Sequence, residues 1–116
     1  MTSCATNKHV NANLSGYLNK MVSIIALHLK DDIDYEQIKK CGYEFKTFFG
    51  SVRAQYQDKQ SKLGTPDRSE SNIINQVINS FQCLESASQK MINETFEKAN
   101  FKKIIKSANF LRYVKM

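Results

Sequence analysis

The sequence predicts an all-α protein, a single-domain antiparallel bundle of about four helices that follows a flexible N-terminal tail. Two observations lead to this fold class. The 116 residues include one proline and four glycines, so few residues interrupt a helix. Apolar side chains also recur three and four positions apart over long stretches, which is the period of an amphipathic helix. Because the length fits one domain, we expect residues 1–12 to be the tail and residues 13–116 to be the bundle.

The first helix is expected to begin near Leu14. Residues 1–12 are polar and show no apolar period, which is typical of a mobile terminus. Asn13 or Ser15 can cap the helix that follows. Its apolar stripe keeps the helical spacing at Leu14, Tyr17, Leu18, Met21, Ile24, Ile25 and His28.

The second helix has the clearest start signal in the chain. Asp34 is the expected N-cap, and Gln37 stands three residues later, at the spacing of a capping box. Ile33 and Ile38 occupy the positions of a hydrophobic staple. Only residues 30–33 separate this start from the first helix, so the two helices are expected to form a hairpin.

An aromatic-rich stretch, "CGYEFKTFFGSVRAQY" at residues 41–56, allows two interpretations. Its rings either form a platform on which nucleic-acid bases stack or line the buried face of a helix. The helical period favours the buried face, and the basic residues fall mostly off it. Gly42 and Gly50 would let another helix come close, or Gly50 would mark a kink. The stripe consists of Ile38, Cys41, Phe45, Phe48, Phe49, Val52 and Tyr56.

Residues 62–71, "KLGTPDRSES", form the strongest break in the chain. Gly64 is placed to end the second helix, and Thr65 and Pro66 are placed to cap and open the third. We expect a tight turn between helices here. The third helix is expected to extend to Ala99, with a possible bend in the weakly apolar residues 85–89. Its stripe reads Ile74, Val77, Ile78, Phe81, Leu84, Met91, Ile92, Thr95, Phe96 and Ala99.

The apolar stripe changes phase at Ala99 and Asn100, which predicts a break and then a fourth helix to Met116. The new face consists of Phe101, Ile104, Ile105, Ala108 and Leu111. Lys102 and Lys103 would stand at the positive end of the dipole of this helix, where a cation is unfavourable unless an anion binds there.

The chain is basic, with a net charge of +6 and a pI of about 9.3. This charge suits an anionic partner, although it is also within the range that a small domain carries for solubility alone. Lysines outnumber arginines by fourteen to three. Because arginine is the usual residue for bidentate base contacts, the lysine excess favours attraction to a phosphate backbone over base reading.

The basic residues of the second and fourth helices are the candidate anion-binding or nucleic-acid-binding residues. Three interpretations compete: a solvated surface, a surface that follows a phosphate backbone, and an amphipathic membrane-surface helix, which the absence of Trp makes less fitting. Phe110 and Tyr113 would either stack on bases or complete the core. The candidates are Lys39, Lys40, Lys46, Arg53, Lys98, Lys102, Lys103, Lys106, Arg112 and Lys115.

The sequence nominates no catalytic residue, no cofactor site and no metal site, so we expect the protein not to be an enzyme. It has no glycine-rich phosphate loop and no GxSxG, HExxH or paired CxxC motif. His28 and Asp32 are one helical turn apart, but two ligands make a weak metal site. Cys41 and Cys83 fall on apolar stripes and are expected to be buried as small hydrophobic residues.

We expect an intracellular protein, cytoplasmic or nuclear, because residues 1–12 contain no apolar leader and "MVSIIALHL" is too short to span a bilayer. The first functional interpretation is a helical protein-interaction or assembly module. Its apolar faces would mediate self-association or partner binding, and its Lys-rich faces would engage an acidic partner. The alternative is a nucleic-acid-binding helical subunit that contacts phosphates without base specificity, as in ribonucleoprotein complexes.

Overall fold

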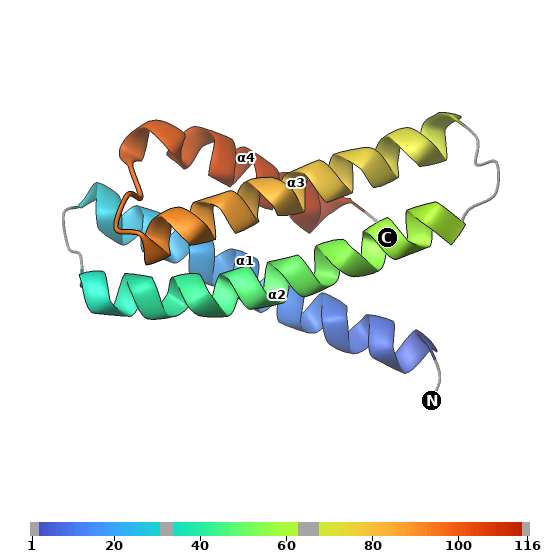
Figure 1. The fold of residues 1–116 in the computed structure, drawn as a ribbon, viewed down its shortest axis with the longest axis horizontal. Helices are drawn as coiled ribbons and strands as arrows, with labels where there is room; N and C mark the ends of the chain where they lie inside the picture. Colours follow the sequence, from blue (N-terminus) through green and yellow to red (C-terminus); the bar gives the residue numbers. More distant parts are fainter. Residues whose placement is uncertain (1–2, 31–33, 63–67, 115–116) are drawn as a thin grey trace. The chain divides into compact units, whose positions relative to one another are not determined.

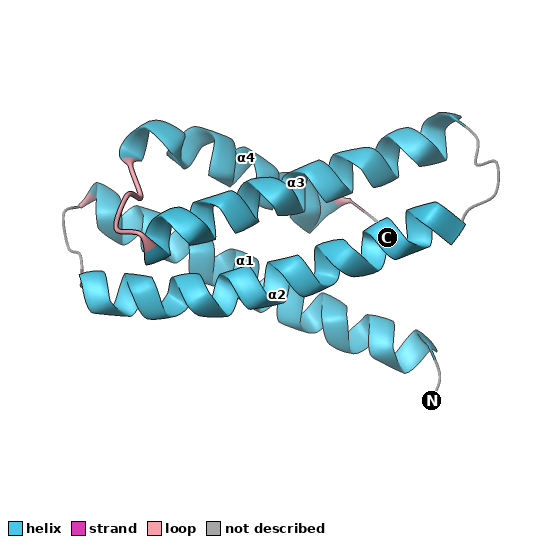
Figure 2. Ribbon diagram, in the orientation of Figure 1, coloured by secondary structure: helices cyan, strands magenta, loops and turns pink. Residues whose placement is uncertain are grey.

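The computed structural model describes residues 3–30, 34–62 and 68–114, with side chains from residue 13 and, in the last range, from residue 72. Within these ranges the ordered elements are helices (Figures 1 and 2), so the all-α helical bundle is confirmed. The chain divides into two compact units, residues 1–33 and residues 34–116, and the single domain expected from the sequence stays a prediction. The elements are α1 (Ser3–Leu29), α2 (Tyr35–Lys62), α3 (Arg68–Ile92), a short 3-10 helix η1 (Lys98–Asn100) and α4 (Phe101–Tyr113).

Helix α1 begins at Ser3, so it includes most of the stretch that was expected to be a tail. Residues 3–12 contain neither proline nor glycine, and a helix can continue through them without an apolar stripe. The flexibility of residues 1–12 stays a prediction. The predicted stripe is confirmed, because Leu18, Met21 and Ile25 are each at most 1% exposed.

Helix α2 begins where its cap predicted. The Asp34 carboxylate oxygen Oδ1 accepts hydrogen bonds from the backbone N–H groups of Glu36 at 3.1 Å and of Gln37 at 3.3 Å. These two bonds satisfy amides that have no partner within the helix. Asp34 is therefore the N-cap. Ile33, the other half of the expected hydrophobic staple, lies outside the described residues.

The aromatic-rich stretch of α2 forms the core of the second unit. Phe45 and Phe49 are 0% exposed, as is Phe81 of α3. The Phe49 and Phe81 ring centroids lie 6.2 Å apart, and the Tyr56 ring stacks on Phe81 at 6.0 Å. Burial raises the pKa of the Tyr56 hydroxyl above its ordinary value. The buried-face interpretation is confirmed for this stripe, and Tyr43, which lies off it, is 56% exposed.

At Gly42, α2 and α3 come into close contact. A Cβ added at Gly42 would lie 2.9 Å from the Cβ of Met91 and 2.9 Å from the carbonyl oxygen of Ser88. Ser88 is 0% exposed, and its hydroxyl donates a hydrogen bond to the Leu84 carbonyl at 2.7 Å. The buried hydroxyl is thus satisfied within α3. The expected close approach at Gly42 is confirmed, and α2 continues unbroken through Gly50.

Helix α3 ends at Ile92, so the prediction of a helix to Ala99 is wrong. The N–H of Thr95 bonds to the Lys90 carbonyl at 2.8 Å, and the N–H of Glu94 bonds to the Met91 carbonyl at 3.4 Å. This pair of bonds is the Schellman pattern of a helix end. Its left-handed residue is Glu94, with φ 61°, instead of the usual glycine. Residues 85–89, where a bend was considered, lie inside the unbroken α3.

Helix α4 begins at Phe101, where the change of phase predicted a new helix. It packs against α3, which also packs against α2, so α3 is the central helix of this unit. The ring centroids of Phe101 and Phe96 lie 4.8 Å apart. These two rings therefore pack against each other at the end of the connection between α3 and α4. Ile104, Ala108 and Leu111 are buried as predicted. Gly64, Thr65 and Pro66, assigned to the turn before α3, lie outside the described residues.

We predict that Gly42→Ala lowers the free energy of unfolding by about 1–2 kcal/mol, because the added methyl group has no room between α2 and α3. Chemical denaturation measures this change. The matched control is Gly16→Ala in α1, where nothing lies within 4 Å of the new Cβ. Alanine is the better helix former there, so stability or helicity should rise. A Gly42→Ala variant as stable as the original chain would contradict the close contact.

We predict that Glu94→Gly raises the free energy of unfolding by about 1 kcal/mol, because glycine has no steric penalty in the left-handed region. The midpoint of urea denaturation, at an unchanged slope, measures the gain. Glu97→Gly is the control. Glu97 has an extended backbone with φ −111°, so glycine removes no steric penalty at that position. A destabilised Glu94→Gly variant would show that α3 does not end in this way.

Candidate functional site

Two of the predicted basic residues on α2, Lys46 and Arg53, contact side chains of α3. Lys46 Nζ donates a hydrogen bond to Gln89 Oε1. Further along, Gln60 Nε2 donates to Asn75 Oδ1. We call the pairs Lys46–Gln89, Arg53–Glu85 and Gln60–Asn75 the α2–α3 polar seam. It runs along the edge of the contact between the two helices.

The side chain of Arg53 belongs to this seam through its contact with Glu85. Its guanidinium forms an ion pair with the Glu85 carboxylate, and the two side chains are 26% and 20% exposed. Arg53 Nη1 also donates a hydrogen bond to Gln57 Oε1 at 2.6 Å. Because its charge is neutralised in a partly buried pair, Arg53 stabilises the contact between α2 and α3 and offers little charge to an external anion.

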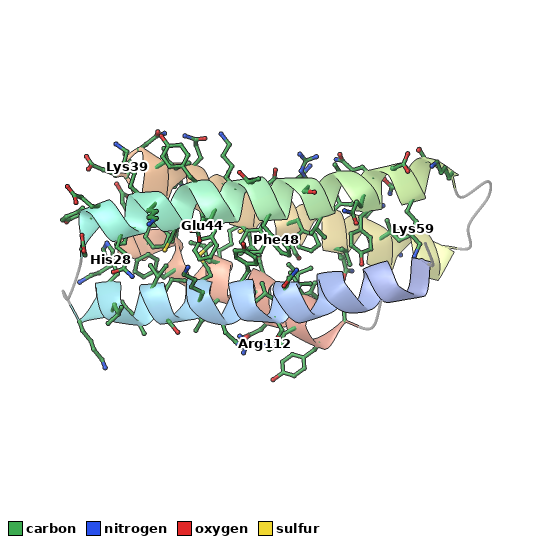
Figure 3. The ribbon with its side chains drawn as sticks, turned by 90° about the horizontal axis from the view of Figure 1, so that it is seen from below. His28, Lys39, Glu44, Phe48, Lys59 and Arg112 are labelled. Carbon is green, nitrogen blue, oxygen red and sulfur yellow. The ribbon has the colours of Figure 1, made fainter. Side chains whose placement is uncertain are left out.

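The outer surface of α2 carries charges of both signs. Lys39 and Lys40 are exposed, but so are Glu36 and Glu44. Figure 3 shows Lys39 near the beginning of α2 and Lys59 near its end. At that end, Lys62 pairs with Asp58 at 2.9 Å. The lysines of α2 therefore do not form a continuous basic surface.

Helix α4 presents a surface of one charge sign. Lys102 and Lys106 are exposed and lie one turn apart, and Lys103 is exposed beside them. The spacing from Lys102 through Lys106 and Asn109 to Tyr113 is four, three and four residues, so these side chains share one face. Tyr113 is 79% exposed. We call Lys102, Lys103, Lys106, Asn109 and Tyr113 the α4 lysine face.

No carboxylate belongs to α4, since the segment "FKKIIKSANFLRY" contains neither Asp nor Glu. Within the described part of the chain, no ion pair or hydrogen bond involves the side chains of Lys102, Lys103 or Lys106. The first two also stand in the first turn, where the helix dipole is positive. Their charges therefore add to the dipole and raise the local potential.

Two further candidate residues lie close to the α4 lysine face along the chain. Lys98 is exposed on η1, just after the exposed Glu97, and Arg112 is exposed near the end of α4. Figure 3 shows Arg112 well separated from Lys39. Lys115 lies outside the described residues. Phe110 is half-buried, whereas the exposure of Tyr113 shows that it does not complete the core.

The structure gives the remaining candidates for chemistry little support. His28 is half-buried, and Asp32 lies outside the described residues. The described side chains contain no group of three metal-ligating residues. Cys41 is buried as predicted, but Cys83 is only half-buried. None of the described helices is both long and apolar enough to cross a membrane.

Comparisons of the chain with protein-family models, with curated proteins and with solved structures find no match. The functional argument therefore depends on the surface chemistry of the described residues.

We predict that Arg53 and Glu85 are energetically coupled. A double-mutant cycle of Arg53→Ala and Glu85→Ala should give a coupling free energy of about 1 kcal/mol, because both partners are partly buried. Chemical denaturation of the four proteins measures it. The control cycle uses Lys62 and Asp58, an exposed pair that should couple by less than about 0.5 kcal/mol. Equal coupling in the two cycles would contradict a structural role for Arg53.

Proposed function

We propose that this protein is a non-enzymatic, intracellular interaction module that binds an acidic partner through the α4 lysine face. The observation that carries the proposal is the unbalanced charge of this face. Three exposed lysines lie within two helical turns on α4, and no carboxylate of the same helix offsets them. An acidic partner would supply the missing counter-charges.

The argument for α4 over α2 follows from where the carboxylates lie. On α2 the basic residues take part in the polar seam or stand close in the sequence to exposed carboxylates, namely Glu36, Glu44 and Asp58. Charges of opposite sign within about 10 Å largely cancel for a distant partner at physiological salt. On α4 the lysine charges add, so this helix contributes most to the attraction of an anion.

The buried side of α4 supports this role by fixing the outer side in place. Phe101, Ile104, Ala108 and Leu111 are at most 3% exposed. Burying the three larger of these side chains contributes about 1.5–3 kcal/mol each, and this fixes the orientation of the helix about its own axis. The lysines are therefore presented as a fixed row, and a partner does not have to order the helix when it binds.

Self-association through apolar helix faces stays a prediction. The alternative interpretation, a nucleic-acid-binding subunit, also uses the α4 lysine face, since a phosphate backbone is one kind of acidic partner.

We predict that Lys102→Glu, Lys103→Glu and Lys106→Glu, combined, weaken binding of anionic probes at least about tenfold at low salt, because attraction is replaced by repulsion. Fluorescence anisotropy with a labelled poly-glutamate peptide and a labelled single-stranded oligonucleotide measures the change. The matched control is Lys39→Glu, Lys40→Glu and Lys59→Glu on α2, which alters the net charge equally.

The α2 triple variant should lose less than about threefold in affinity, because its lysines stand among carboxylates. Equal losses in both triple variants would mean that only net charge matters and would contradict the proposal. The absence of binding to either probe, even at low salt, would contradict it as well.

A further inference from the structure

The α4 lysine face ends in an aromatic ring that the fold leaves exposed. Tyr113 is 79% exposed, the highest fraction among the large hydrophobic side chains that the structure describes. It follows Lys102, Lys106 and Asn109 along one ridge of the helix. Exposed aromatic rings in line with cations are the combination that binds unpaired bases and their phosphates.

We propose that the acidic partner of the α4 lysine face is a single-stranded nucleic acid. This inference rests on the proposed function and names the partner. The ammonium groups of Lys102, Lys103 and Lys106 contact successive phosphates, and the ring of Tyr113 stacks on an unpaired base. The Asn109 amide lies between them in the row and can donate to a phosphate oxygen or a base edge.

The ring distinguishes this partner from an acidic protein. The lysines alone would suit carboxylates and phosphates equally, since each ammonium acts as a point charge. A base offers a planar π surface to Tyr113, and base–aromatic stacking adds affinity that does not depend on sequence. A duplex keeps its bases stacked inside, so the ring favours a single strand.

The dimensions of the ridge suit a short stretch of strand. From Lys102 to Tyr113 the helix rises about 16 Å at 1.5 Å per residue. At the 3.4 Å rise of one strand of a duplex, this length covers about five nucleotides, and fewer when the strand is extended. Because lysine does not form the bidentate contacts that read guanine, binding is expected to be nearly independent of sequence.

The other exposed tyrosines do not offer the same combination. Tyr35 and Tyr43 of α2 are 58% and 56% exposed. Glu36 and Glu44 are exposed next to them in the sequence, and a phosphate near these rings would meet a carboxylate. Tyr43 lies one turn from Lys39 and one turn from Lys46, but carboxylates stand beside this row. Tyr43 is therefore a suitable control for an exposed tyrosine whose neighbouring lysines are offset by carboxylates.

The test is fluorescence anisotropy with a labelled twelve-nucleotide single-stranded oligouridine, its deoxy counterpart, a duplex of equal length and a poly-glutamate peptide. Tyr113→Ala should weaken binding of the single strands at least about fivefold, the loss expected for one stacked base. Tyr113→Phe keeps the ring and should stay within about twofold of the original chain. Tyr43→Ala should also stay within about twofold.

Salt dependence separates the two parts of the site. Three phosphate contacts predict a slope of about −2 for log K against log salt with a single strand. The combined Lys102→Glu, Lys103→Glu and Lys106→Glu variant should lose this slope. Tyr113→Ala should keep it, because stacking releases no counterions.

The outcomes distinguish this inference from the proposed function. If the lysine variant weakens binding but Tyr113→Ala does not, the face binds polyanions without stacking, and the inference is overturned while the proposed function stands. Tighter binding of poly-glutamate than of the single strands would also overturn the inference and leave the proposed function standing. It would identify an acidic protein as the partner. If no probe binds, both the inference and the proposed function fail.

Discussion

The second unit depends on the close contact of α2 and α3 at Gly42. Hydrogen at this position, in place of a methyl group, lets the backbone of α2 reach Ser88 and Met91 of α3. The buried Ser88 hydroxyl bonds within its own helix, so the contact leaves it no unmet hydrogen bond. From this point the stripe of α2 extends through Phe45 and Phe49, and Phe81 of α3 meets it. Helix α3 can then hold α4 as a second neighbour.

This packing also determines which basic residues remain available to a partner. The seam along the α2–α3 contact pairs Arg53 with Glu85 and Lys46 with Gln89, so these cations serve the fold. Helix α4 uses only its apolar side for packing, and no carboxylate of its own offsets its lysines. Within the described residues of the second unit, the lysines of α2 stand among carboxylates, whereas those of α4 have none on their own helix. This uneven distribution of charge is the basis for the proposal that α4 carries the binding surface.

Patterns local in the sequence predicted much of the fold. The helical period placed Phe45, Phe49 and Val52 in the core, Asp34 was identified as a cap from its spacing, and the change of phase located the start of α4. The end of α3 was missed because its left-handed residue is Glu94, where a glycine would have given the signal. The Arg53–Glu85 pair joins residues 32 positions apart, a separation that no local pattern reports. The sequence left open whether Tyr113 stacks on bases or completes the core, and the packing of α4 leaves its ring exposed.

Native-state hydrogen exchange of the whole chain tests the central role of the α2–α3 contact most directly. If this contact holds the unit together, the amides around Gly42 to Val52 and Leu84 to Met91 should exchange only through global unfolding. The amides of α4 should exchange faster, through local opening, because α4 packs on α3 and is not needed for the α2–α3 pair. Slower exchange in α4 than in the middle of α2 and α3 would contradict this account, because the stable centre of the unit would then lie elsewhere.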